Sequence, residues 1–296
     1  MKVLITGSNG QVGGCLVKQL QTCTNTEILA VDRTELDITS KSDVIQIVGS
    51  FKPNIIINAA AHTAVDKAES EIDLSYAINR DGPLYLAQAA ENIGAALLHI
   101  STDYVFDGNK DGIYSETNTV NPKSVYGATK LAGEKAVIEA CSRAVILRTA
   151  WVFGEEGNNF VKTMLRLAVQ RDELCIVADQ FGGPTYAGDI AAALITIAND
   201  IMMQGNDFDH SQYGIYHFSG LPHISWCGFA QTIFDKAVEQ KVLDKAPIVK
   251  GINTEDYPTP AKRPANSKLD TQKITETFGI QASDWQSALN QLADYQ

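Results

Sequence analysis

The segment Lys2-Val3-Leu4-Ile5-Thr6-Gly7-Ser8-Asn9-Gly10-Gln11-Val12-Gly13 decides the fold of this chain. A short, continuously apolar run ends at a turn with three glycines, and an amphipathic pattern of helical period follows. This order predicts strand, glycine turn and helix. The glycines let the backbone turn tightly and approach a pyrophosphate, whose negative charge then meets free N–H groups at the helix N-terminus. We therefore expect a dinucleotide-binding domain.

An acidic residue stands where such a domain needs one. A second strand is predicted at residues 27–31 and ends in Asp32-Arg33. Asp32 lies about 20 positions after the glycine turn, where a carboxylate can hydrogen-bond the adenosine ribose. Its charge would repel a 2′-phosphate and favours NADH, whereas Arg33 could pair with that phosphate and favours NADPH. Both cofactors stay open, although the glycine spacing departs from Gly-x-Gly-x-x-Gly.

Strand and helix patterns continue to alternate along the first half of the chain. Further strands are predicted at 54–58, 95–101 and 144–148, with helices at about 40–50, 74–92 and 124–141. This alternation predicts an α/β fold, a Rossmann-type doubly wound parallel sheet. Asp37 and Ile38 would then come within reach of an adenine ring.

The second half has shorter and more scattered strand patterns. Residues 1–154 are predicted to form the dinucleotide-binding domain, with later segments returning to it. Residues 155–296 are expected to form mainly a smaller α/β lobe over the carboxyl edge of the sheet. The cleft between the two parts is the natural site for a second ligand.

The candidate chemistry lies in the stretch 124–130. Tyr126 and Lys130 are four positions apart on a predicted helix with Ser124 as its N-cap, so their side chains share one face. A lysine ammonium beside a phenol would lower the pKa of the tyrosine and let it exchange a proton with a carbonyl or alcohol. Tyr126 is therefore the candidate general acid. So short a motif is weak evidence alone and gains weight from the nucleotide domain around it.

Other candidates follow strand ends, which line the ligand crevice of a parallel sheet. Thr102, Asp103 and Tyr104 follow one strand, and Trp151 follows another. Trp151 either stacks on a ligand ring or packs in the interior. Arg263, in a proline-rich segment, is either a diphosphate contact or a surface arginine. His62, without carboxylate or cysteine partners at ligand spacing, is predicted to be a hydrogen-bonded loop residue.

Composition excludes several classes of function. The formal net charge is -11 and the sequence contains no Lys/Arg cluster, which argues against a nucleic-acid partner. The five cysteines form no Cys-x-x-Cys pair and are expected to be reduced. No run is long enough for a signal peptide or a membrane span. We expect a soluble cytoplasmic protein.

Several motifs together resemble the extended short-chain dehydrogenase/reductases. They are Gly7-x-x-Gly10-x-x-Gly13, Asn58-Ala59-Ala60, Ser101-Thr102-Asp103-Tyr104-Val105-Phe106 and Tyr126-x-x-x-Lys130. Further motifs, spread over nearly the whole chain, are similar to one branch of that family. These are Thr63-Ala64-Val65-Asp66-Lys67-Ala68-Glu69, Arg148-Thr149-Ala150-Trp151-Val152-Phe153-Gly154, Pro184-Thr185-Tyr186 and residues 263–270. The branch reduces the C4 keto group of dTDP-4-dehydro-6-deoxy-L-mannose to dTDP-L-rhamnose.

The resemblance implies a role for particular residues. Thr102, Tyr126 and Lys130 would be catalytic, and Thr102, Asp103 and Trp151 would touch the dTDP-sugar. Cofactor contacts would come from Gly10, Gln11, Val12, Asp32, Asp37, Ile38, Ala61, His62 and Thr63, with Lys130 on the nicotinamide ribose beside Tyr126. Family members commonly form homodimers, and some bind a divalent cation at the dimer contact. One position of that kind is Cys15 here, so no metal is predicted.

Two other functions stay open. A sugar-nucleotide epimerase or dehydratase uses the same tyrosine and lysine but recycles tightly bound NAD. Dehydratases of this fold usually carry Asp-Glu after the threonine, whereas Asp103-Tyr104 follows Thr102 here. A regulatory subunit of the same fold is the alternative outside catalysis, and the complete Thr, Tyr and Lys set argues against it.

Overall fold

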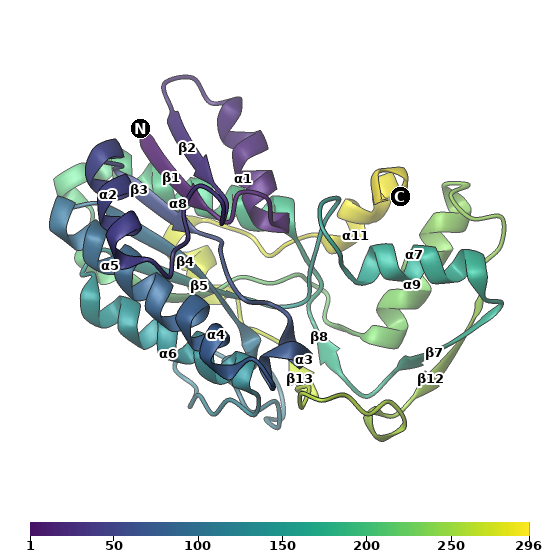
Figure 1. The fold of residues 1–296 in the computed structure, drawn as a ribbon. Helices are drawn as coiled ribbons and strands as arrows, with labels where there is room; N and C mark the ends of the chain where they lie inside the picture. The colour runs from purple at the N-terminus through teal and green to yellow at the C-terminus, as the bar shows by residue number, and fades with distance from the viewer. Residues whose placement is uncertain (296) are drawn as a thin grey trace.

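The computed structural model describes residues 1–295. Its centre is a six-stranded sheet in the order β2-β1-β3-β4-β5-β10, in which every neighbouring pair is parallel (Figure 1). The strands are β1 (Lys2–Thr6), β2 (Glu27–Val31), β3 (Ile55–Asn58), β4 (Ala96–Thr102), β5 (Ala144–Thr149) and β10 (Gly214–His217). The predicted α/β fold with a Rossmann-type doubly wound parallel sheet is confirmed.

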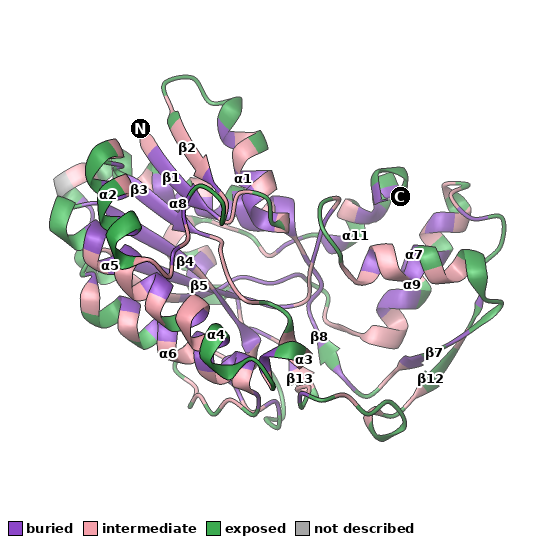
Figure 2. Cartoon of the chain, in the orientation of Figure 1, coloured by how far each residue is buried: buried purple, intermediate pink, exposed green. Residues whose placement is uncertain are grey.

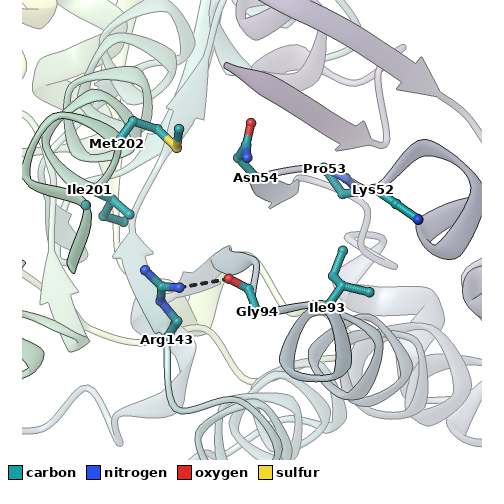
Figure 3. A pocket seen from close by; sticks show the side chains of 9 residues that line it. Lys52, Pro53, Asn54, Ile93, Gly94, Arg143, Ile201 and Met202 are labelled. Carbon is teal, nitrogen blue, oxygen red and sulfur yellow. Dashed lines mark hydrogen bonds between the residues drawn. The ribbon is translucent and has the colours of Figure 1, made fainter.

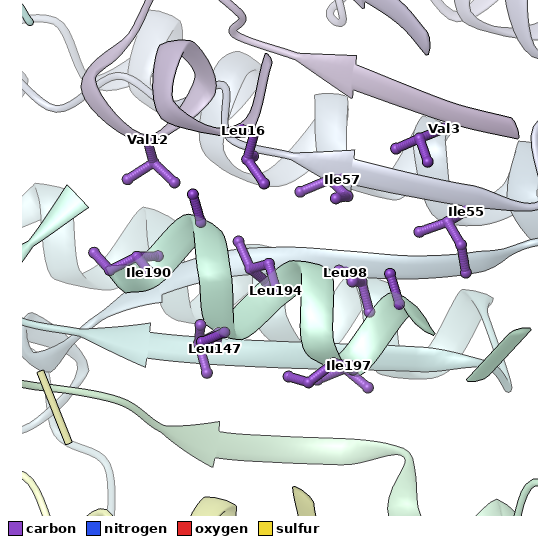
Figure 4. Close-up of a cluster of buried hydrophobic side chains, with 14 of the residues drawn as sticks. Val3, Val12, Leu16, Ile55, Ile57, Leu98, Leu147, Ile190, Leu194 and Ile197 are labelled. Carbon is purple, nitrogen blue, oxygen red and sulfur yellow. The ribbon is translucent and has the colours of Figure 1, made fainter. Parts of the chain in front are cut away.

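One face of the sheet is covered by α1 (Gln11–Gln21) and α8 (Ala187–Gln204). Strand residues alternate between the faces, so Val3, Ile55 and Leu98 all point to this side. They meet Leu16 of α1 and Leu194 of α8 in one buried apolar cluster (Figure 4). A late segment of the chain, α8 together with β10, thus completes the nucleotide domain.

The opposite face is covered by α2 (Lys41–Phe51), α5 (Gly82–Ile93) and α6 (Val125–Ala140). Leu4, Ile56 and Leu97, one position along from the strand residues above, point to this side and are fully buried. The sheet is therefore apolar on both faces, as parallel sheets between helices require.

The helix predicted at about 74–92 is a composite. Its first turn is α4 (Ile72–Tyr76), a π-helical turn η1 (Ala77–Asp81) follows, and α5 completes it. The π turn widens the helix beside α6 and brings Asn79 into the interior, where its side chain is fully buried. A period-3.6 pattern alone does not reveal such a turn.

The remaining chain forms a smaller lobe with its own core, on the right of Figure 1. It contains α7 (Phe160–Gln170), β7 (Glu173–Val177), α9 (Trp226–Glu239), β12 (Ile248–Ile252), α11 (Trp285–Ala288) and η6 (Leu289–Tyr295). A strand at residues 174–177 is predicted from the sequence and corresponds to β7, whereas β12 and its pairing with β7 were not predicted. The lobe lies beyond the carboxyl ends of the central strands.

Short elements connect the two parts. The strands β6 (Val152–Phe153) and β9 (Thr185–Tyr186) pair, and β8 (Phe181–Gly182) pairs with β11 (Ile224–Ser225) and β13 (Asn266–Ser267). Other short elements are α3 (Val65–Ala68), α10 (Gln272–Phe278) and the 3-10 turns η2 (Asp103–Val105), η3 (Gly205–Asp207), η4 (His210–Gln212) and η5 (Thr254–Asp256).

Burial follows this layering. Figure 2 shows the central strands buried and the outer faces of the helices exposed. Within residues 1–295, no helix combines the length and apolarity that crossing a membrane requires. Several buried polar side chains, among them Thr6, Asn58 and Thr102, lie at the carboxyl ends of the strands, and they mark the site described next.

Candidate active site

The glycine turn has the geometry that close approach of a ligand requires. Gly7 has φ of +71°, and a Cβ there would lie 2.7 Å from the backbone nitrogen of Ala60. A Cβ on Gly13 would lie 2.0 Å from the carbonyl oxygen of Gly7. Gly10 is the N-cap of α1 and supplies no side-chain cap, so the first N–H groups of the helix point to the turn. The turn is thus a cradle for an anion.

Gln11 and Val12 begin the helix behind this turn. Val12 is buried in the core between α1 and the sheet. The side-chain oxygen of Gln11 accepts a hydrogen bond from Asn159 at 3.1 Å, which ties the turn to the segment before α7.

Asp32 follows β2 at the same edge of the sheet. Its carboxylate accepts hydrogen bonds from Asn9 of the glycine turn and from the backbone and hydroxyl of Thr34, and the Thr34 bonds lower the pKa of Asp32. Arg33 is highly exposed and lies 3.8 Å from Asp37. Ile38 is buried against the helix that starts at Gly82. An ionised carboxylate and a loosely held guanidinium therefore share the expected ribose position.

The loop after β3 contains Ala61, His62 and Thr63 and is held by Asn79. The Asn79 side chain accepts from the His62 backbone N–H at 2.8 Å and donates to the His62 carbonyl at 3.2 Å and to Thr129 at 3.1 Å. The His62 ring lies 2.8 Å from the Ser75 hydroxyl. The prediction that His62 is a hydrogen-bonded loop residue is confirmed. The role of Asn79 was not predicted, because a lone asparagine within a helix carries no distinctive pattern.

Helix α6 presents Tyr126 and Lys130 toward the end of β4. The predicted N-cap is confirmed, since the Ser124 hydroxyl accepts from the Gly127 backbone N–H at 3.2 Å. A Cβ on Gly127 would lie 2.2 Å from the carbonyl oxygen of Tyr104. Glycine thus allows the first turn of α6 to lie directly on the strand end, and it brings the Tyr126 ring to 5.4 Å from the Tyr104 ring, edge on.

The electrostatics of this pair differ from the prediction. Burial raises the pKa of Tyr126, and a hydrogen bond with Thr102 only partly opposes that effect. Burial also lowers the pKa of Lys130, to about 8. The pKa of the phenol is therefore raised by burial rather than lowered as predicted, and the Lys130 Nζ donates to the Ile100 carbonyl at 2.6 Å. The phenol therefore stays protonated at neutral pH.

Thr102, Asp103 and Tyr104 turn away from β4 in η2. The Thr102 hydroxyl donates to the Asp103 carboxylate at 2.9 Å, and Ser267 of β13 donates to the other carboxylate oxygen. Asp103 is buried, which raises its pKa to about 6. Ser267 was missed by the sequence analysis, since nothing local to β13 indicates a partner so distant in the chain.

A cavity of about 680 Å³ lies between the nucleotide domain and the smaller lobe. Its size falls in the range of small-molecule sites. Arg263 lines it, pairing with Asp66 at 2.5 Å and donating to the Tyr104 hydroxyl at 3.2 Å. Tyr104 also lines the cavity and contacts Tyr126, so it connects the cavity to the candidate acid.

Trp151 forms one wall of this cavity in a strained conformation. Its φ of 51° lies in the left-handed region that favours glycine. The indole stacks on Trp226, with ring centroids 3.5 Å apart, and packs over Gly182. Both tryptophans line the cavity. Trp151 therefore packs against Trp226 and is also placed where it can contact a ligand.

A second cavity, of about 510 Å³, lies at the other end of the sheet (Figure 3). Lys52, Asn54, Gly94 and Arg143 line it, and all four precede strands. Arg143 donates to the Gly94 carbonyl at 2.8 Å, and Figure 3 shows this bond across the opening. Ligands of open α/β sheets bind at the carboxyl ends of the strands, so the first cavity is the candidate site.

Cys15 lies buried on α1, and its pKa is raised to about 11 by burial and by the Glu155 charge. In the described part of the chain, no three His, Cys, Asp or Glu side chains gather closely enough to hold a metal ion.

Known proteins match this chain along its whole length. The family model described as RmlD substrate binding domain matches residues 1–296. A dTDP-4-dehydrorhamnose reductase of Aggregatibacter actinomycetemcomitans is 55% identical over 294 residues, which cover 99% of each chain. The structure of a dTDP-4-dehydrorhamnose reductase from Clostridium acetobutylicum superimposes with a TM-score of 0.89 at 42% identity, covering 99% of each chain. That of the Bacillus anthracis reductase in complex with NADP gives a TM-score of 0.86 at 39% identity, covering 99% of this chain and 98% of that one.

Proposed function

The chain belongs to the RmlD substrate-binding-domain family of dTDP-4-dehydrorhamnose reductases, and from this premise we propose how its residues divide the work. The reaction is the NAD(P)H-dependent reduction of the C4 keto group of dTDP-4-dehydro-6-deoxy-L-mannose to dTDP-L-rhamnose. One observation carries the assignment of roles: a buried phenol, Tyr126, and a buried amine, Lys130, share one face of α6 at the carboxyl end of β4.

The cofactor site is the edge formed by the glycine turn, Asp32 and the loop after β3. Gly7 and Gly13 leave the space that a pyrophosphate needs, and the uncapped N-terminus of α1 supplies its N–H donors. Bound there, a reduced nicotinamide supplies a hydride for the keto carbon. Asp32 favours an unphosphorylated ribose, while the exposed Arg33 can reach a 2′-phosphate, so the chain is expected to accept both NADH and NADPH.

Tyr126 is the proton donor of the proposed mechanism. Its raised pKa keeps the phenol protonated at neutral pH, which suits a group that must protonate a developing alkoxide. Thr102 orients the keto oxygen beside it. Lys130 supplies positive charge when the phenol gives up its proton.

The dTDP-sugar is proposed to occupy the cavity between the lobes. Trp151 would lie against a ring of the ligand, and Arg263 would offer its guanidinium to the diphosphate. Because Arg263 pairs with Asp66 in this structure, the phosphate must compete with that carboxylate.

Stoichiometry tests this function against its nearest rivals. Purified protein is mixed with NADPH and the keto-sugar nucleotide, and nicotinamide absorbance is followed. We expect one cofactor oxidised per sugar reduced. Product formed without net cofactor consumption would instead indicate an epimerase, and binding of both ligands without turnover would indicate a regulatory subunit.

A cytoplasmic homodimer is proposed on the strength of the sequence resemblance. All five cysteines lie within the described residues and none forms a disulfide, in keeping with a reducing compartment. Light scattering on the purified protein should give twice the chain mass of 32.1 kDa.

A further inference from the structure

Three polar residues on neighbouring strands lie in register behind Lys130; two of them end their strands, and the third, His99, is in the middle of β4. Thr6 of β1 is the register partner of Asn58 of β3, and Asn58 is the partner of His99 of β4. Each of the three follows, two positions along its strand, a residue of the apolar cluster that packs under α5 and α6. Side chains two positions apart share one face of a sheet, so all three point toward these helices. None is more than 1% exposed, so their hydrogen bonds must be made within the protein.

The backbone determines which way this chain of hydrogen bonds runs. The Ala60 N–H can only donate, and it reaches Asn58 Oδ1 at 3.1 Å. Thr6 Oγ1 lies 2.7 Å from the same oxygen and donates to it. The oxygen of the Asn58 amide is thereby identified, and its Nδ2 donates to His99 Nδ1 at 3.0 Å.

His99 then has only one favourable tautomer. Burial, reinforced by the Lys130 charge, holds the pKa of His99 well below its ordinary value, so the ring is neutral. With Nδ1 as acceptor, the ring proton must lie on Nε2. That N–H points to Lys130 Nζ, which is 3.4 Å away. An ammonium has no lone pair to accept it, whereas a neutral amine does.

We propose that His99 is a positioning residue that, oriented by Asn58, presents an N–H to Lys130 and so governs how firmly this lysine holds its proton. His99 stabilises the neutral amine, while the Ile100 carbonyl accepts from Nζ in either protonation state. This inference deepens the proposed function, because it rests on the role proposed there for Lys130.

Most other ionisable groups near Lys130 already have hydrogen-bond or ion-pair partners of their own. Glu134, one turn further along α6, favours the ammonium but is ion-paired with Arg148 of β5 at 2.7 Å. Tyr126 is the neutral phenol one turn earlier, and Asp103 at the end of β4 is held by Thr102 and Ser267. From η1, Arg80 pairs with Asp81 at 2.7 Å, partly exposed. His99 is thus the group that opposes the lysine charge through a direct contact.

The tautomer can be read in the unmodified full-length protein. Long-range ¹⁵N–¹H correlation spectra of protein labelled with ¹⁵N-histidine separate the two tautomers and the imidazolium from about pH 6 to 9. The five histidines are assigned by replacing His62, His210, His217 and His223 singly with glutamine. The proposal requires a neutral His99 ring with its proton on Nε2. A proton on Nδ1, or a charged ring, overturns it.

Two variants then test the effect on the reaction. His99→Leu removes the N–H that faces Lys130. In Asn58→Asp, the new carboxylate accepts from Nδ1–H, so the ring proton moves to Nδ1 and Nε2 offers a lone pair to the Lys130 ammonium. Each change favours the protonated lysine. Both should move the alkaline limb of the pH profile of kcat upward by about one unit. Ile146→Val, at the register partner of His99 on β5, controls for a perturbed core and should leave the limb unmoved.

The outcomes separate this inference from the proposed function. If the alkaline limb of the kcat profile stays where it is in the unmodified enzyme for both variants, and only the rate falls uniformly, His99 has a structural role and the inference is overturned. Full turnover in Lys130→Met would instead remove the lysine from the proposed mechanism, while the His99 tautomer, a property of the folded protein, would still be measured. The spectrum decides even where a variant does not fold.

Discussion

Ser267, in β13, donates its hydroxyl to the carboxylate of Asp103, which stands 164 positions earlier at the end of β4. Both residues are buried. Thr102 donates to the same carboxylate, so one acidic group joins the candidate catalytic strand end to the C-terminal part of the chain. The shape of the site therefore depends on a segment that carries none of the proposed catalytic groups.

Ser267→Ala tests this connection. The variant leaves a buried carboxylate with one donor fewer, and a hydrogen bond to a charged group contributes roughly 1.5–3 kcal/mol. We expect the free energy of unfolding at pH 8 to fall by that amount in urea titrations. Ser42→Ala, at an exposed position of α2, is the matched control and should be neutral. Equal stability of the two variants would show that the Asp103 contact contributes nothing.

The pH dependence of stability should reveal Asp103. Its pKa is raised from 3.8 to about 6 by burial, so the folded protein binds this proton more tightly than the unfolded chain. The stability that the protonated Asp103 carboxyl contributes is fully present below about pH 4 and is lost as the pH rises through about 6. Asp103→Asn cannot ionise. Across that window, its stability should rise relative to the unmodified protein by on the order of 3 kcal/mol, measured by urea unfolding. If the unfolding free energies of the two proteins changed in parallel with pH, the raised pKa of Asp103 would be contradicted.

Adjacent glycines of α1 offer a matched pair for the cofactor site. A Cβ on Gly13 would lie 2.0 Å from the Gly7 carbonyl oxygen, whereas a Cβ on Gly14 would meet nothing closer than 3.6 Å. Gly13→Ala should distort the turn and weaken NADPH binding at least about tenfold, which is roughly 1.4 kcal/mol. Gly14→Ala should bind normally. Fluorescence titration measures both, and equal affinities would place the dinucleotide elsewhere.

The buried pair Glu134–Arg148 supports α6 from within. The two side chains are 2% and 3% exposed and lie 2.7 Å apart. Glu134→Gln leaves the guanidinium charge without its partner and should cost about 3–5 kcal/mol of unfolding free energy. The double variant Glu134→Gln, Arg148→Met removes both charges and should recover part of that loss. No recovery in calorimetry would mean that packing, rather than charge, explains the cost.

Features encoded locally were predictable from the sequence. The glycine turn, the Ser124 cap and the Tyr126–Lys130 face each depend on residues within one or two turns of the chain. The parallel sheet followed from the alternation of strand and helix patterns. Residues at strand ends could be assigned to a common crevice because the topology brings such ends together.

Features that depend on distant partners were not predictable. The stacking of Trp151 on Trp226 and the pairing of β12 with β7 join segments whose own patterns indicate no partner. The direction of the Tyr126 pKa shift was wrongly predicted, because spacing on a helix does not reveal how deeply the phenol is buried. One usable signal was overlooked: Thr6, Asn58 and His99 are polar residues that follow apolar runs at equivalent strand positions.

The central claim is that the Tyr126 phenol delivers the proton in the reduction. Tyr126→Phe keeps the ring and its contact with Tyr104 but removes the only group that can donate at that position. Tyr213→Phe, whose hydroxyl pairs with Arg143 at the amino end of the sheet, is the control. The most direct measurement is the single-turnover rate of bound NADPH oxidation by the keto-sugar nucleotide. We predict a rate lower by about 10² to 10⁴ in Tyr126→Phe, with cofactor affinity and fold unchanged; a rate equal to that of the unmodified enzyme would contradict the account.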